Sequence, residues 1–125
     1  MQKILLFILL TTSLFSNDII AILDLEQIGL TPQEATILTQ RLTTKLVSIG
    51  KYQVVERNNM DKILKEQKFQ QAGCTDQQCA AEIGKMLNAD LMLISTILFN
   101  RDEGQMSATF KLVNVESARI TTATT

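Results

Sequence analysis

The sequence contains no histidine and no tryptophan, and only 5% of its 125 residues are aromatic. Without histidine, no imidazole group is available for acid–base catalysis or for binding a metal ion. The five glycines are scattered along the chain, so there is no glycine-rich loop that would cradle a phosphate group. These absences remove a large part of enzyme chemistry, and we expect no cofactor.

Positive charge is not concentrated in any segment of the sequence. The 12 lysine and arginine residues are spread among 13 acidic residues, for a formal net charge of −1. A nucleic-acid-binding protein needs a basic face that neutralises phosphates. The sequence therefore predicts no binding to DNA or RNA.

A basic residue followed by an apolar run opens the sequence. Lys3 precedes the mostly apolar residues 4–15, a run shorter than the about 20 residues that a membrane-spanning helix needs. This pattern is typical of a secretory signal peptide, and we expect residues 1–16 to be removed after Ser16. No cysteine lies near that site to serve as the lipid-modified cysteine of a bacterial lipoprotein. We expect a periplasmic mature chain with no membrane-spanning segment.

The first half of the mature chain predicts a strand followed by a helix. Residues 18–25 are rich in isoleucine and leucine, as in a strand that is buried on both faces. Thr31, Pro32 and Glu34 supply an N-cap, a proline in the first turn and a reciprocal capping residue. Gly50 stands where a left-handed C-cap is expected. Between them lies an apolar stripe expected to face the sheet, formed by Ala35, Leu38, Leu42, Leu46 and Ile49.

Two more helices are expected before the long strands. A short strand at residues 51–56 precedes a helix that Asn58 or Asn59 is expected to cap. After a loop at residues 70–74, Thr75 opens a second capping-box pattern and begins the third helix. The pattern is strand, helix, strand, helix, helix.

Three strands complete the chain. Residues 91–99 are continuously apolar, residues 105–115 alternate apolar and polar side chains, and residues 118–124 form the last strand. The early strands need crossover connections and parallel pairing, whereas the last ones form hairpins. We predict a single α/β domain over residues 17–125. It has a mixed five-stranded sheet of order 2-1-3-4-5, an antiparallel fourth strand, and helices packed on its faces.

Cys74 and Cys79 are the only cysteines of the chain. In an exported protein such a pair is expected to form a disulfide. A redox-active pair is the alternative, although the Cys-x-x-Cys spacing is absent. Zinc would need further cysteine or histidine ligands. We predict a structural disulfide that holds the loop against the start of the third helix.

Few charged residues suggest a site. Asp24 and Glu26 fit solvated residues at the end of a strand better than an acid–base couple. Glu56 and Arg57 close the second predicted strand, and we interpret them as a local ion pair, with a contact to a partner protein as the alternative.

The last predicted strand lies at an open edge of the sheet. Residues 118–125 are β-prone and almost uncharged, and unpaired backbone groups at such an edge can pair with another chain. Ile120 and Thr122 are therefore candidate partner contacts. The alternatives are a frayed terminus and a truncated chain.

Five segments spread over nearly the whole mature chain carry a family resemblance. They are residues 20–25 (IAILDL), 54–66 (VVERNNMDKILKE), 73–79 (GCTDQQC), 82–87 (EIGKML) and 111–116 (KLVNVE). These segments resemble the soluble domain of the CsgG-like periplasmic proteins, a family that includes the curli secretion channel component. That domain is similar to the N-terminal domain of TolB and to the lipoprotein activators of penicillin-binding proteins.

The resemblance implies a non-enzymatic envelope protein that acts through protein contacts in curli assembly or in secretion at the outer membrane. The chain departs from the family pattern in three places. It lacks the lipobox cysteine, it is shorter than a channel-forming member, and its turn at residues 100–104 is too short for membrane-spanning hairpins. Ala118 also stands where the family's final turn has a glycine. We expect envelope proteins or further copies of the chain as partners. The alternative is a binder of a small molecule or a peptidoglycan fragment.

We predict that the mature protein begins at Asn17, or within a few residues of it, and fractionates with the periplasm. Cleavage after Ser16 by a signal peptidase is the physical reason. Intact-mass measurement and N-terminal sequencing of the exported protein check this. A chain that begins at Met1 and is found in the inner membrane would contradict it.

Overall fold

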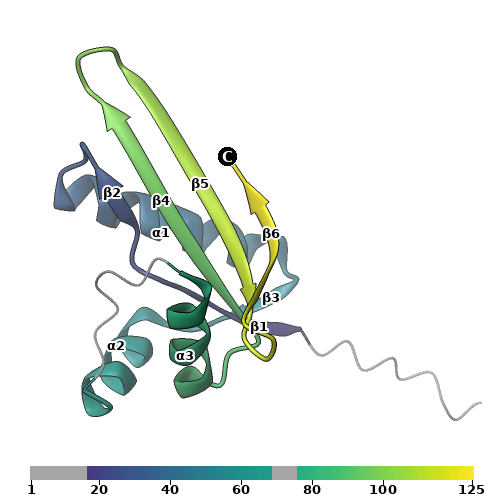
Figure 1. The fold of residues 1–125 in the computed structure, drawn as a ribbon. Helices are drawn as coiled ribbons and strands as arrows, with labels where there is room; N and C mark the ends of the chain where they lie inside the picture. Colours follow the sequence, from purple (N-terminus) through teal and green to yellow (C-terminus); the bar gives the residue numbers. More distant parts are fainter. Residues whose placement is uncertain (1–16, 69–75) are drawn as a thin grey trace, which may run out of the picture.

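The computed structural model describes residues 17–68 and 76–125. In this part of the chain three helices pack on a mixed six-stranded sheet (Figure 1). The elements are β1 (Asp18–Ile22), β2 (Glu26–Ile28), α1 (Pro32–Ile49), β3 (Tyr52–Val54), α2 (Arg57–Glu66), α3 (Gln77–Leu87), β4 (Leu91–Asn100), β5 (Gln105–Asn114) and β6 (Arg119–Thr124). None of the helices in the described residues is long and apolar enough to cross a lipid bilayer.

The strand β4 organises the sheet, because it pairs with β1, β2 and β5. The strand order is β3-β1-β4-β5-β6, and β2 pairs with β4 beyond the end of β1. The pairs among β1, β2, β3 and β4 are parallel, whereas β5 is antiparallel to β4 and β6 is antiparallel to β5. The predicted α/β class, strand order and antiparallel fourth strand are confirmed.

The predicted first strand is interrupted, which gives six strands where five were predicted. Ile22 pairs with Leu93 and Glu26 pairs with Thr96, so residues 23–25 lie opposite residues 94–95. The one extra residue acts as a bulge that separates β1 from β2. Because side chains alternate between the faces of a strand, the extra residue also reverses which face the following side chains occupy.

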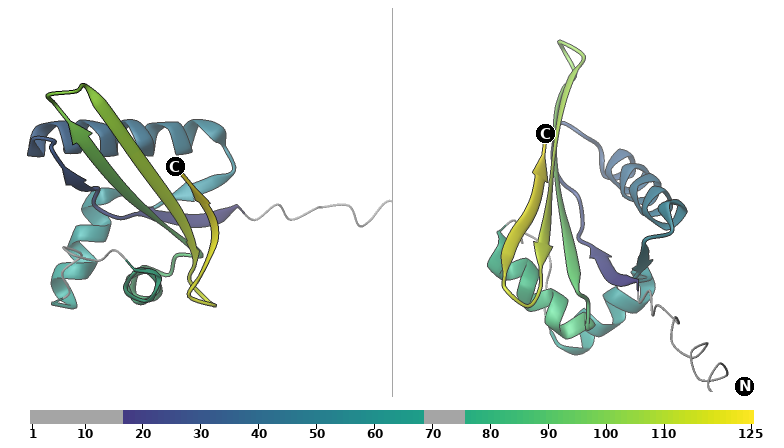
Figure 2. Two further views of the ribbon diagram at one scale, coloured as in Figure 1. Left: turned by 45° about the horizontal axis from the view of Figure 1, so that its top comes forward. Right: turned by 90° about the vertical axis from the view of Figure 1, so that its right-hand side faces the viewer.

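The helices lie on both faces of the sheet, with α1 on one face and α2 and α3 on the other (Figure 2). The face with α2 and α3 holds the larger core. Its buried members include Ala21, Leu23, Met60, Leu64, Ala80, Ile83, Met92 and Val113. On the other face, Ile20, Ile22, Leu91 and Leu93 form a smaller buried cluster.

The helix α1 covers its face loosely: Leu42 and Leu46 of the predicted stripe pack against the smaller cluster, but the stripe is not fully buried as predicted. No residue of α1 is buried, and Ile49 is 48% exposed. A space of about 260 Å³ remains between α1 and the sheet. The physical reason is that threonines stand beside the leucines on this side of the helix. Thr39 and Thr43 donate their hydroxyl groups to helix carbonyl oxygens, so short polar side chains occupy positions where larger apolar ones would fill the gap.

The predicted ends of α1 are confirmed. The Thr31 hydroxyl accepts from the Glu34 N–H at 3.2 Å, and the Glu34 carboxylate accepts from the Thr31 N–H at 2.9 Å. Gly50 is in the left-handed conformation at the C-cap, with φ 75°. Both ends are local motifs that need no contact from elsewhere in the chain.

The predicted starts of the other two helices are wrong by one to three residues. The helix α2 begins at Arg57 after Glu56, so Asn58 and Asn59 lie in its first turn and do not cap it. It begins early because the chain leaves the sheet directly after Val55, whose N–H still donates to the Ile20 carbonyl. The N-cap of α3 is Asp76, which accepts from the backbone N–H three residues on. The predicted N-cap Thr75 lies outside the described residues.

We predict that Gly29→Ala lowers the free energy of unfolding by about 2–4 kcal/mol. Gly29 joins β2 to α1 at φ +91°, and an added Cβ would lie 1.9 Å from the Phe99 carbonyl oxygen. Left-handed strain and displacement of the β4 backbone therefore add. Urea unfolding followed by circular dichroism measures the loss.

Gly104→Ala is the matched control for this measurement. Gly104 also has a positive φ, +65°, but nothing lies within 4 Å of its added Cβ. Only the backbone strain applies there, and we expect a loss of about 1 kcal/mol. Equal losses for the two variants would contradict the close approach at Gly29.

Candidate functional site

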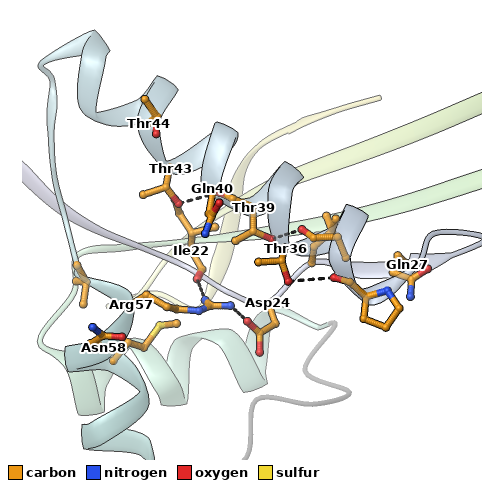
Figure 3. A pocket seen from close by; sticks show the side chains of 15 residues that line it. Ile22, Asp24, Gln27, Thr36, Thr39, Gln40, Thr43, Thr44, Arg57 and Asn58 are labelled. Atoms are coloured by element: carbon orange, nitrogen blue, oxygen red, sulfur yellow. Dashed lines mark hydrogen bonds and ion pairs between the residues drawn. The ribbon is translucent and has the colours of Figure 1, made fainter.

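A groove of about 860 Å³ opens between α1, the β1–β2 connection and the first turn of α2 (Figure 3). Threonine and glutamine side chains of α1 form one wall, and Arg57 and Asn58 of α2 stand opposite them. The volume is within the range of about 300–1,000 Å³ that is usual for ligand sites. The apolar residues between the walls are Ile22, Leu25, Val55 and Met60.

The groove exists because β3 ends early. Its last residue, Val54, pairs with Ile20, and the chain then turns into α2. Within the described residues β2 pairs with β4 alone. The edge of β2 that points away from β4 therefore has no strand beside it, and α1 passes over this unfilled position.

Arg57 closes the groove at its α2 end. Its Nη1 donates to the Ile22 carbonyl oxygen at 3.1 Å, and its Nη2 pairs with the carboxylate of Asp24. The side chains of Arg57 and Asp24 are 39% and 52% exposed, so solvent screens this pair. Arg57 thus supplies a donor to a backbone acceptor that a longer β3 would have satisfied.

The α1 wall of the groove is polar but carries no charge. Thr36, Thr39 and Thr43 each donate their hydroxyl to the carbonyl oxygen four residues earlier, at 2.9–3.0 Å. Their methyl groups and the remaining lone pairs of the oxygens stay available at the surface. Among all the groove residues only Asp24 and Arg57 are charged, and they pair with each other. The groove therefore suits an uncharged occupant with mixed polar and apolar groups.

A second apolar surface lies where the β4–β5 hairpin meets the start of α1. Phe99 and Met106 line it with residues of α1, and Met106 is 57% exposed. Arg101 holds the hairpin in place, because it pairs with Glu34, donates to the Gly29 carbonyl at 3.1 Å and lies 5.1 Å from the centre of the Phe99 ring. The N–H of Thr31, and secondly Arg101, lower the pKa of Glu34.

The edge of the sheet at β6 is the other unpartnered feature. All six residues of β6 are exposed, and in the described part of the chain β6 pairs with β5 alone. Its outward backbone donors and acceptors are therefore available to another strand.

The structure separates the predicted partner contacts into two places. Glu56 and Arg57 lie at the start of α2 beside the groove, whereas Ile120 and Thr122 lie on β6 at the opposite edge of the sheet. Arg57 pairs with Asp24 rather than with its chain neighbour. Asp24 is therefore an ion-pair residue and not only a solvated strand end.

The predicted disulfide stays a prediction. Cys74 lies outside the described residues, and Cys79 lies in the first turn of α3, where its N–H donates to Asp76. The cap by Asp76 therefore fixes the backbone position of Cys79, one of the two cysteines of the predicted pair.

The groove-facing residues of α1 and β2 were not predicted from the sequence. Gln27, Thr36, Gln40 and Thr43 line the groove, whereas the apolar periodicity of α1 indicates only its sheet-facing side. The detectable signal was a second, polar stripe at residues 36, 40 and 43, with the same helical spacing as the leucines.

Solved structures define the class of this fold. The chain is similar to the LpoB C-terminal domain from Escherichia coli, with a TM-score of 0.71 and 14% identity over 91% of this chain and 84% of that one. Lipoprotein GNA1162 from Neisseria meningitidis matches with a TM-score of 0.68 and 12% identity over 86% and 76%. The PelC dodecamer from Paraburkholderia phytofirmans matches with a TM-score of 0.53 and 14% identity over 86% and 67%. These likenesses show a shared fold.

The family follows from the sequence itself. Residues 30–108 match the family described as Curli production assembly/transport component CsgG. The match covers more than half of the 125 residues, and the chain belongs to the CsgG family. This confirms the resemblance found in the sequence. No curated protein matches the chain significantly.

We predict that Arg57→Met lowers the free energy of unfolding by about 1–2 kcal/mol, because it leaves the Ile22 carbonyl without its donor. Lys62→Met is the matched control: it also removes one positive charge from α2, at an exposed position. We expect the control to change stability by less than about 0.5 kcal/mol. Guanidinium unfolding measures the free energy of unfolding of both variants. Equal losses would show that the lost charge, and not the lost hydrogen bond to Ile22, causes the effect.

Proposed function

We propose that this chain is a periplasmic protein of the cell envelope that acts through protein–protein contacts in assembly or secretion at the outer membrane. It catalyses no reaction. Its partners are envelope proteins or further copies of the chain. Export through residues 1–16 and a disulfide between Cys74 and Cys79 are parts of the same proposal, since an oxidising compartment favours the bond.

Membership of the CsgG family supports an assembly or transport role, because the family is described as a curli production assembly/transport component. A location in the envelope is supported by the likeness to a lipoprotein. The likeness to PelC, which was solved as a dodecamer, supports self-association as one form of these contacts.

The open edge of the sheet at β6 carries the proposal. Residues 120–125 are uncharged and rich in threonine, and all of β6 is exposed. A strand of this composition lacks the lysines and prolines that commonly protect sheet edges against pairing. Addition of a partner strand is the contact that such an edge makes most directly.

The groove favours a second candidate function, the binding of a small molecule or a peptidoglycan fragment. Its volume of about 860 Å³ and its mixed lining suit a neutral, hydroxyl-rich ligand. Titration of the protein with soluble muropeptides, followed by NMR, separates the two candidates. Shifts confined to groove residues, with no protein–protein contacts at β6, would favour the ligand-binding function.

We predict that proline at Ile120 or at Thr122 reduces assembly size and partner capture, because it removes one backbone donor from the edge. Proline is tolerated in a strand only where its N–H would face solvent. The variant that keeps the wild-type circular dichroism and melting temperature is therefore the informative one. Sedimentation velocity and periplasmic crosslinking measure the result.

Thr122→Val is the matched control, since it changes the same side chain and keeps the backbone N–H. We expect this control to assemble and to capture partners as the wild type does. Unchanged assembly and capture in a folded proline variant would overturn the role of the β6 edge.

A further inference from the structure

We infer that the groove beside β2 receives the β6 strand of a second copy, so that copies of the chain associate head to tail. This inference rests on the proposed function, because it takes the β6 edge as the donor. It adds the acceptor: the unfilled position beside β2, under α1.

The hydrogen bonds along the outer edge of β1 show that a strand position is left empty. The Val55 N–H donates to the Ile20 carbonyl at 2.9 Å as the continuation of β3. The next donor along this edge belongs to a side chain: Nη1 of Arg57 binds the Ile22 carbonyl at 3.1 Å. Beyond Ile22 the described residues place no strand beside β2, and Gln27 of β2 lines the groove.

The length of the groove suits one short strand. Its α1 wall extends from Pro32 to Thr44, which corresponds to about 18 Å of helix. The six residues of β6 extend over about 20 Å. A longer partner strand would meet the first turn of α2, where Arg57 and Asn58 close the groove (Figure 3).

Charge and side-chain size select β6 as the occupant. The only charged groove residues are paired with each other, so a buried charge from the occupant would have no partner. Arg119 at the start of β6 is its only charged residue; residues 120–124 carry no charged side chain, and all but Ile120 are threonine or alanine. No other strand of the described chain is both uncharged over five consecutive residues and exposed along its whole length.

The donor and the acceptor are different surfaces of one molecule, at opposite edges of the sheet. Such a contact is heterologous. Each copy added still presents a free donor at one end and a free acceptor at the other, so the assembly grows into a ring or a filament.

The test uses Thr36→Lys in the full mature chain. Thr36 lines the groove and is exposed, and lysine is a good helix former. A lysine there places a charge against the incoming uncharged strand. Sedimentation velocity of the purified protein over a range of concentrations should show self-association of the wild type. In the variant the association should be weaker by about tenfold or more.

Ser48→Lys is the matched control. Ser48 is also exposed on α1 and also donates its hydroxyl to a helix carbonyl, but it is not among the groove residues. Its variant adds the same charge to the same helix. We expect it to associate as the wild type does.

Mixing two defective variants tests the head-to-tail geometry. Thr36→Lys keeps its β6 donor, whereas the folded β6 proline variant keeps its groove. The equimolar mixture should form a dimer with one copy of each and no larger species. If the contact joined two identical surfaces, such as two β6 edges, mixing the two variants would not restore association.

Each remaining outcome overturns the inference. If the Thr36→Lys protein associates as the wild type does, the groove is not the acceptor. If the folded β6 proline variant fails to associate in the same experiment, the proposed function still stands, because β6 is then the contact surface without the groove. A third outcome is that only the β6 proline variant loses association and partner capture, and that mixing it with Thr36→Lys does not restore association. This outcome indicates that two β6 edges pair with each other. A wild-type chain that stays monomeric rejects the second copy as the occupant. Unchanged capture of envelope partners in the folded proline variant would contradict the proposed function itself.

Discussion

The pairing of two successive strands with one edge of β4 is the constraint on which the rest of the structure depends. β1 and β2 both run beside β4, and one extra residue lies between their two registers. That residue lets Asp24 leave the edge and pair with Arg57, and it brings Gln27 to the same side as α1. The early end of β3 opens the groove, and the interruption between β1 and β2 places Asp24 and Gln27 at it.

The two faces of the sheet have different packing, and this difference places recognition on one of them. On the α2 and α3 face, Gly84 lets the helix approach Met92 and Val115 so closely that an added Cβ would lie 2.4 Å from the Val115 side chain. On the α1 face the helix has no buried residue. A tightly packed face gives rigidity, whereas the loosely covered face leaves room for an occupant.

Local signals predicted local structure, and long-range pairing decided the rest. The capping box at Thr31 and the left-handed Gly50 were predictable because their hydrogen bonds close within a few residues. The start of α2 was not, since it depends on where β3 stops pairing with Ile20. The bulge was not predictable because residues 19–23, which lead into it, are continuously apolar and show no alternation that would mark a change of face. The groove was not predicted because the polar stripe on α1 borders a groove only where β3 is too short to fill the space beside β2, and the length of β3 depends on long-range pairing.

The strand β6 contributes no buried side chain to the core, and this suits a docking edge. Ala118, in the turn before it, has φ 56°, a left-handed conformation that costs a residue with a Cβ about 1–2 kcal/mol. The β5–β6 register shifts between Leu112 and Val113, and β6 buries no side chain. Elements with few buried contacts open with low free energy. β6 can therefore adjust its twist to a second sheet without disturbing Ile83 and Met92, which are fully buried and lie on elements with which β6 does not pair.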